Sequence, residues 1–119
     1  MTLEKQTVEE FVAVVKQGPV SFSNTMDIVS MFYTYSPTGF YNGVGDRQFY
    51  NESGTNEGSC KLFALAQLLG LDEQATLNCF GDYYTVDVLQ YPNGDDHQNI
   101  RTFIDCGWQG IRFDKIALT

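Results

Sequence analysis

The middle of the chain reads NEGSCKLFALAQLLG from residue 56 to residue 70. Its apolar side chains recur at helical spacing and, at about 100° per residue, centre on one face, at Leu62, Leu65, Ala66 and Leu69. Asn56 or Thr55 can cap the first turn. Gly70 readily adopts the left-handed backbone conformation that commonly ends a helix. We therefore predict a helix from residue 56 to Gly70.

Three further helical segments follow toward the C-terminus, over residues 72–81, 82–92 and 95–107. An aspartate can cap each of the first two, and a glycine or a proline ends each of them. The third begins with a capping-box pattern, in which Asp95 is followed three residues later by Gln98. The second half of the chain is therefore predicted to be mainly helical.

Two more helices are expected before the central one. Thr7 followed by Glu10 forms another capping-box pattern, and apolar residues then recur at helical spacing until Gly18 stops them. Residues 24–32 also carry apolar side chains at helical spacing, although an alternating pattern fits nearly as well. We predict helices over residues 8–15 and 24–32.

Aromatic and β-forming residues replace the helical pattern between residues 33 and 50. The Asn42-Gly43 pair in this stretch is a strong hairpin signal. Residues 111–113 alternate between apolar and charged side chains, which predicts a closing strand. The 119 residues are enough for one domain. We predict an α+β fold, a mostly helical single domain over residues 1–119 with a small antiparallel sheet.

The charge of the chain excludes two classes of partner. Fifteen acidic residues against seven basic ones give a formal net charge of −8 and a sequence pI near 4.3. The basic residues are scattered along the chain. Such a surface repels phosphate backbones and anionic lipid. We therefore expect the protein to bind neither nucleic acid nor membranes.

The cysteines and the N-terminus indicate a compartment. Three widely separated cysteines favour free thiols over a disulfide framework. The sequence holds no run of about twenty apolar residues, and Glu4 and Lys5 stand where a cleavable signal would have its apolar stretch. We expect a cytosolic protein, in the cytoplasm of a bacterium or of a host cell.

Cys60 is the first candidate for chemistry. It falls in the first turn of the predicted central helix, where unpaired N–H groups and the helix dipole favour a thiolate, and Lys61 adds a positive neighbour. It also lies off the main apolar stripe. The alternative is a small side chain tucked against a neighbouring loop, because free cysteines are among the most buried residues.

His97, the single histidine, is the candidate general base for Cys60. Asp82 or Asn99 would then orient the imidazole, so that the catalytic residues of a cysteine-dependent hydrolase or acyl transferase would be Cys60, His97, Asp82 and Asn99. This hypothesis requires the helix starts near Cys60 and His97 to face each other. The alternative for His97 is a half-buried side chain that hydrogen-bonds nearby backbone.

A small-ligand site is the third possibility, between the sheet and the helix starts near Asn56 and Asp95. The residues expected to contact such a ligand are Asn56, Glu57, Ser59, Arg101 and Tyr35. The aromatic residues between 33 and 50 either line such a groove or partner surface or pack in the core. No metal-ligand spacing favours a zinc or calcium site, so we expect no metal and no cofactor.

Several segments together resemble one known family: Gly54–Lys61, Cys79–Tyr84, Asp96–Arg101, Gly107-Trp108 and the stretch from Tyr35 to Gly43. They are similar to the HopJ family of type III secretion effectors, and the likeness covers nearly the whole chain. The resemblance implies a bacterial protein related to effectors that plant pathogens inject into host cells. It carries over no catalytic residues.

The leading functional hypothesis is therefore an effector-like protein that acts by binding a protein partner or a small ligand. The negative charge would steer it toward basic partners. The alternative is the cysteine-dependent enzyme that uses Cys60 and His97. The sequence leaves open which of the two applies.

Overall fold

The structure is a computed structural model that describes residues 6–119, so the expectation about Glu4 and Lys5 lies outside the described residues. The helices of the described part are α1 (Val8–Val15), α2 (Phe22–Phe32), α3 (Glu57–Leu69), α4 (Glu73–Asn78), α5 (Asp82–Thr85) and α6 (Gln98–Cys106). The strands are β1 (Phe40–Asn42), β2 (Phe49–Asn51) and β3 (Arg112–Phe113), with single 3₁₀ turns at η1 (Gly45–Arg47) and η2 (Gly107–Gly110). The predicted α+β fold is confirmed.

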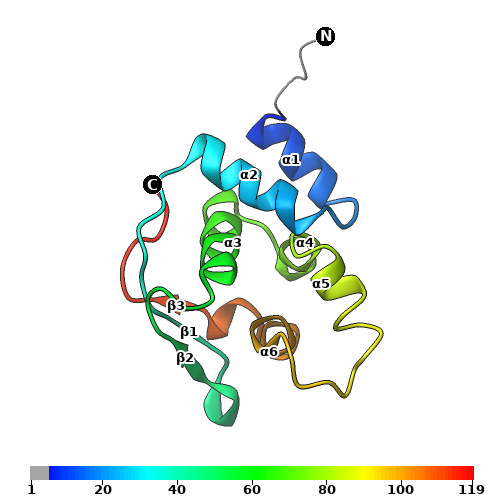
Figure 1. The fold of residues 1–119 in the computed structure, drawn as a ribbon, viewed down its shortest axis with the longest axis vertical. Helices are drawn as coiled ribbons and strands as arrows, with labels where there is room; N and C mark the ends of the chain where they lie inside the picture. Colours follow the sequence, from blue (N-terminus) through cyan, green and yellow to red (C-terminus); the bar gives the residue numbers. More distant parts are fainter. Residues whose placement is uncertain (1–5) are drawn as a thin grey trace.

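The three strands form an antiparallel sheet in the order β2-β1-β3. Phe40 of β1 is opposite Asn51 of β2 and Phe113 of β3. The C-terminal segment then runs beside the segment that follows α2 (Figure 1), where Thr34 and Thr119 exchange backbone hydrogen bonds of 2.9 and 3.1 Å. The predicted closing strand is therefore present as β3, and the segment that follows it pairs with the segment after α2.

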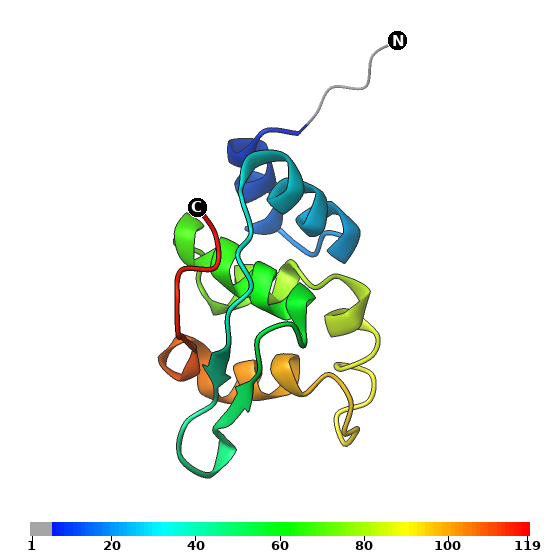
Figure 2. The same ribbon diagram turned by 60° about the vertical axis from the view of Figure 1, so that its left-hand side comes forward.

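Helix α3 lies in the middle of the molecule, with α1 and α2 on one side and the sheet and α6 on the other (Figures 1 and 2). Phe63 of α3 is fully buried, and its ring centroid lies 5.0 Å from that of Phe103, 5.6 Å from Phe80 and 6.0 Å from Phe40. One aromatic side chain thus joins the central helix to β1, to the end of α4 and to α6.

Residues close in sequence cap the starts of α1, α4 and α2. The Thr7 hydroxyl accepts from the Glu10 amide at 3.1 Å and the Glu10 carboxylate accepts from the Thr7 amide at 3.2 Å, so the predicted capping box of α1 is confirmed. The carboxylate of Asp72 accepts from the Ala75 amide at 2.8 Å and caps α4. Helix α2 begins at Phe22, two residues before the predicted start, because Ser21 provides its cap.

The Asn42-Gly43 pair does not form a two-residue hairpin turn. Asn42 is the last residue of β1, and residues 43–48, which include η1, connect β1 to β2. The side chain of Asn42 is fully buried and donates to the backbone carbonyl of Asn99 at 3.0 Å. This contact with α6 holds Asn42 in the strand, so a hairpin is present but its turn is longer than the pair indicates.

The predicted helix over residues 82–92 is wrong in extent, since α5 ends at Thr85 and turns follow it. The cap predicted for the next helix is also displaced. Asp95 lies outside α6, which begins at Gln98 with His97 as its left-handed N-cap residue. The side chain of Gln98 donates to the Asp95 carbonyl at 2.8 Å. The predicted capping box between Asp95 and Gln98 is therefore not formed, and the Gln98 side chain contacts the loop before α6 instead.

Candidate functional site

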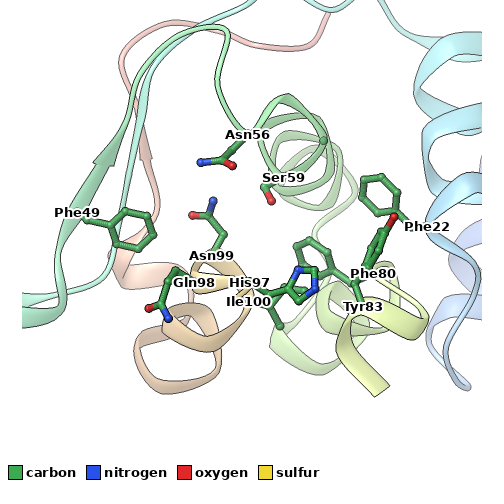
Figure 3. A pocket seen from close by; sticks show the side chains of 11 residues that line it. Phe22, Phe49, Asn56, Ser59, Phe80, Tyr83, His97, Gln98, Asn99 and Ile100 are labelled. Atoms are coloured by element: carbon green, nitrogen blue, oxygen red, sulfur yellow. The ribbon is translucent and has the colours of Figure 1, made fainter. Parts of the chain in front are cut away.

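A recess of about 360 Å³ lies where the starts of α3 and α6 meet. Its lining residues come from five separate parts of the chain and are Phe22, Phe49, Asn56, Gly58, Ser59, Phe80, Tyr83, His97, Gln98, Asn99 and Ile100. Figure 3 shows the side chains of Asn56, Ser59 and Asn99 in the space between the two helices. The two helix starts, some forty positions apart in the sequence, therefore converge, as the hypothesis of a shared site required.

Both helices begin on a non-glycine residue in the left-handed region, Asn56 and His97, each with a φ of 49°. Neither side chain caps its own helix. The first amide N–H groups of a helix have no intrahelical acceptor and carry a partial positive charge. Those of Gly58 and Ser59 in α3, and of Gln98 and Asn99 in α6, belong to residues that line the recess. The recess is therefore rich in hydrogen-bond donors.

Asparagine side chains form a hydrogen-bonded network next to this recess, in which Asn42, Asn51 and Asn99 are buried and Asn56 is exposed. Asn99 Nδ2 donates to Asn51 Oδ1 at 2.9 Å, Asn51 Nδ2 donates to Asn99 Oδ1 at 3.1 Å, and Asn42 Nδ2 donates to the same Asn99 oxygen at 2.9 Å. Asn56 Nδ2 donates to Asn51 Oδ1 at 2.7 Å. This last contact explains why the Asn56 side chain does not cap α3. The network ties β1, β2, α3 and α6 together at the site.

Sequence reasoning missed two members of this network, Asn42 and Asn51. Asn42 was interpreted as a turn residue, and Asn51 falls in a polar stretch that reads as a loop. The available signal was an asparagine at the end of each strand flanking the turn, two positions where a buried amide can bridge to a neighbouring element. That signal becomes specific only once α6 is placed beside the strands.

Aromatic rings form the opposite side of the recess. The ring centroid of Tyr83 lies 5.3 Å from that of His97 and 5.3 Å from that of Phe22, and Phe22 stacks near Phe80 at 6.3 Å. A Cβ atom on Gly58 would lie 2.7 Å from Cζ of Phe22, so only glycine lets this ring approach the start of α3. The recess thus has a donor-rich face and an aromatic face.

His97 is held at the edge of the recess by Asp87. Its Nε2 atom lies 3.0 Å from Oδ2 of Asp87, and both side chains are partly exposed. Asp87, and neither Asp82 nor Asn99, is therefore the residue that orients the imidazole. Asp82 lines a neighbouring cavity with Ser21 and Pro19, whereas Asn99 lines the recess itself.

Cys60 lies on a different side of α3 from the recess. Its side chain is 1% exposed and its sulfur donates to the Thr38 carbonyl at 3.7 Å. Burial raises the pKa of the Cys60 thiol above its ordinary value, which disfavours the thiolate expected at the helix start. His97 lines the recess and Cys60 does not, so the structure does not place in one site the pair that the cysteine enzyme requires. The alternative of a small side chain packed against a loop agrees with the structure.

The Cys60 thiol should be alkylated by iodoacetamide at least about tenfold more slowly in the folded protein than in the unfolded chain. Burial blocks access, and each unit by which the pKa is raised lowers the thiolate fraction about tenfold. Peptide mass spectrometry over a time course measures the rate. Partly exposed Cys106 provides an internal comparison in the same sample. Equal rates for Cys60 in folded and unfolded protein would contradict this.

The remaining candidate ligand residues are not in the recess. Tyr35, whose pKa is raised by burial, lies beneath the ammonium of Lys61 at 4.8 Å and groups with Cys60 and Glu57 on the other side of α3. Arg101 donates to the Tyr91 carbonyl at 2.8 Å and to the Asp96 carboxylate at 2.6 Å. Its role is therefore to hold the α5–α6 loop. Of the ligand residues predicted, Asn56 and Ser59 line the recess.

Two further features follow from residues 6–119. No group of three or more His, Cys, Asp or Glu side chains in this part of the chain is arranged to hold a metal ion. None of its helices combines the length and apolar character needed to cross a bilayer.

Comparison with known proteins gives two matches. A family model described as "HopJ type III effector protein" matches residues 8–118. A solved structure described as "Crystal structure of unknown function protein VPA0580" is 41% identical, with a TM-score of 0.90, and the match covers 98% of this chain and 95% of that chain. No curated protein matches the chain.

Proposed function

The chain belongs to the HopJ family of type III effector proteins, and we propose that it works as a binding protein whose ligand is a small molecule held in the recess between α3 and α6. The observation that carries this proposal is the convergence of two helix starts on one aromatic-walled recess. The family description supports secretion through a type III system and injection into a host cell as the setting in which the ligand is met.

The lining defines the chemistry of the ligand. Backbone amides at the starts of α3 and α6 require hydrogen-bond acceptors, such as a carboxylate or amide oxygen. The rings of Phe22, Phe80 and Tyr83 favour a flat apolar group beside those acceptors. The lining includes no lysine or arginine, and the whole chain carries a charge of −8, so a multiply charged anion is disfavoured. The ligand is a small ring compound with one acceptor group.

Titration with benzoate, benzamide and benzylamine tests this function by ¹H–¹⁵N NMR. Benzoate and benzamide should shift the amide signals of Gly58, Ser59, Gln98 and Asn99, because both present an oxygen acceptor on a ring. Benzylamine has the same ring but a cationic donor, and it should leave these signals in place. The proposal fails if no recess amide responds to either acceptor, or if benzylamine produces the same shifts.

A recess-filling variant completes the test. Ser59→Leu should occupy the space that the ligand needs and abolish the shifts produced by benzoate. Ser30→Leu is the matched control, because Ser30 is exposed on α2 and does not line the recess. Dispersed NMR signals in both variants verify that each one folds. Unchanged benzoate binding by Ser59→Leu would place the binding site elsewhere.

A further inference from the structure

His97 gives the recess a side chain whose charge changes near neutral pH. The other lining residues within the described part of the chain are asparagine, glutamine, serine, glycine and apolar residues, together with the phenol of Tyr83. Histidine gains or loses a proton between pH 5 and 8, whereas a phenol keeps its proton in this range. A change in the charge of the lining over this range therefore occurs on His97.

Asp87 determines which nitrogen of His97 takes part in this change. The Nε2 atom of the imidazole lies 3.0 Å from Oδ2 of Asp87. A carboxylate only accepts hydrogen bonds, so Nε2 carries its hydrogen in both the neutral and the protonated imidazole. The second proton is therefore gained and lost at Nδ1. Neutral His97 offers an acceptor at this atom, and protonated His97 offers a donor.

The Nδ1 atom is the ring nitrogen that remains for a ligand. Asp87, which engages Nε2, does not line the recess, whereas His97 does. The His97 side chain does not cap α6, and within residues 6–119 its hydrogen-bond partner is Asp87 alone. Figure 3 shows the imidazole at the edge of the space between the two helices, beside Tyr83. A ligand in the recess therefore meets the side of His97 that titrates.

The charges around the imidazole act in both directions. Asp87 favours the protonated form from hydrogen-bond distance, and Asp95 and Asp96 precede the histidine directly. The partial positive charge at the start of α6 and the guanidinium of Arg101 oppose protonation, although Arg101 is paired with Asp96 at 2.6 Å. Tyr83 faces the ring from α5, and the lining residues from α2 and α3 carry no charge. A charged group on the ligand is therefore met mainly by His97.

We propose that His97 determines which acceptor group the recess binds, a carboxylate when the imidazole is protonated and a primary carboxamide when it is neutral. The two oxygens of a carboxylate can accept from the helix-start amides and from the Nδ1–H group. A carboxamide has one oxygen for those amides, and its NH₂ group can donate to neutral Nδ1. This inference rests on the proposed function, because it concerns the ligand of the same recess.

NMR titration of the His97 ring tests this selection, since the sequence contains a single histidine and its Hε1 signal is unambiguous in protein without a histidine tag. The pH midpoint of the signal is measured without ligand, with benzoate and with benzamide, at one ionic strength. Benzoate should raise the midpoint by about half a pH unit or more, and benzamide should lower it, because each ligand favours the form of His97 that it contacts. Benzoate should correspondingly bind about threefold or more tightly below the midpoint than above it.

Three variants separate the role of His97 from other effects of pH. His97→Asn removes the titration, and asparagine tolerates the left-handed backbone at this position. Its affinities for benzoate and benzamide, measured on the amide signals of Gly58 and Ser59, should be independent of pH between 5.5 and 8. Ser59→Leu, which fills the recess, should abolish both midpoint shifts, and Ser30→Leu should keep them.

The outcomes distinguish this inference from the proposed function. If both ligands shift the recess amides but leave the His97 midpoint unchanged, or move it in the same direction, the selection by His97 is wrong and the proposed function stands. If neither ligand shifts those amides, both are wrong. A pH dependence of benzoate binding that is as large in His97→Asn as in the unsubstituted protein would also overturn the inference, since another group would then carry the proton.

Discussion

Replacing Asn99 by leucine should lower the free energy of unfolding by about 3–5 kcal/mol. The side-chain oxygen of Asn99 accepts from Asn42 and Asn51, which are 0% and 2% exposed. Leucine has a similar volume but accepts nothing, so these buried amides lose a partner at roughly 1–3 kcal/mol each. The Nδ2 group of Asn99 also loses its contact with Asn51. Urea denaturation followed by circular dichroism measures the change.

Asn93→Leu is the control for this variant. Asn93 is exposed in the α5–α6 loop, so its replacement should change stability by no more than about 0.5 kcal/mol. A loss below about 1 kcal/mol for Asn99→Leu would mean that water satisfies the freed amides. It would then follow that the network contributes little to joining the strands to α6.

Replacing Phe63 by alanine should also lower the free energy of unfolding by about 3–5 kcal/mol, the usual loss for a buried phenylalanine. Phe63 is fully buried, and its ring meets those of Phe103, Phe80 and Phe40. Each of these rings belongs to a different segment, so the surroundings cannot all close on the cavity at once. For a total stability of about 5–15 kcal/mol, this is a large fraction.

Leu68→Ala on the same helix is the comparison for Phe63→Ala. Leu68 is 55% exposed, so its truncation should cost less than about 1 kcal/mol while keeping the helix propensity of α3. Phe63→Leu should fall between the two, because it removes less buried volume. Equal losses for Phe63→Ala and Leu68→Ala would contradict the central position assigned to Phe63.

The locally capped starts of α1 and α4 could be predicted, whereas the start of α6, which depends on distant contacts, could not. Thr7 with Glu10, and Asp72 with Ala75, form their capping contacts within three positions. The start of α6 was displaced from Asp95 to His97. The reason is that Arg101 and Asp87 fix the preceding loop through contacts outside the capping sequence.

The convergence of the two helix starts agrees with the hypothesis drawn from the sequence, but the side chains that face the recess differ from those it named. The start of α3 does face the start of α6, but it presents Ser59 to the recess, while Cys60 is directed to the Thr38 carbonyl. These neighbours differ by about 100° around the helix axis. Which of them faces a cavity depends on where the segment before β1 packs, and that placement is not visible in helical periodicity.

The sequence by itself determined the caps of α1 and α4, the α+β class, the net negative charge and the family resemblance, because each of these rests on composition or on residues close together in the chain. Only the tertiary structure decided that Asn42 and Asn99, 57 positions apart, share hydrogen bonds, and that the central helix is buried on the side carrying Cys60 as well as on its apolar stripe. The physical reason is that a buried polar group takes its partner from whichever element packs against it. The packing of the core, and not the neighbouring sequence, therefore determines which groups become hydrogen-bond partners.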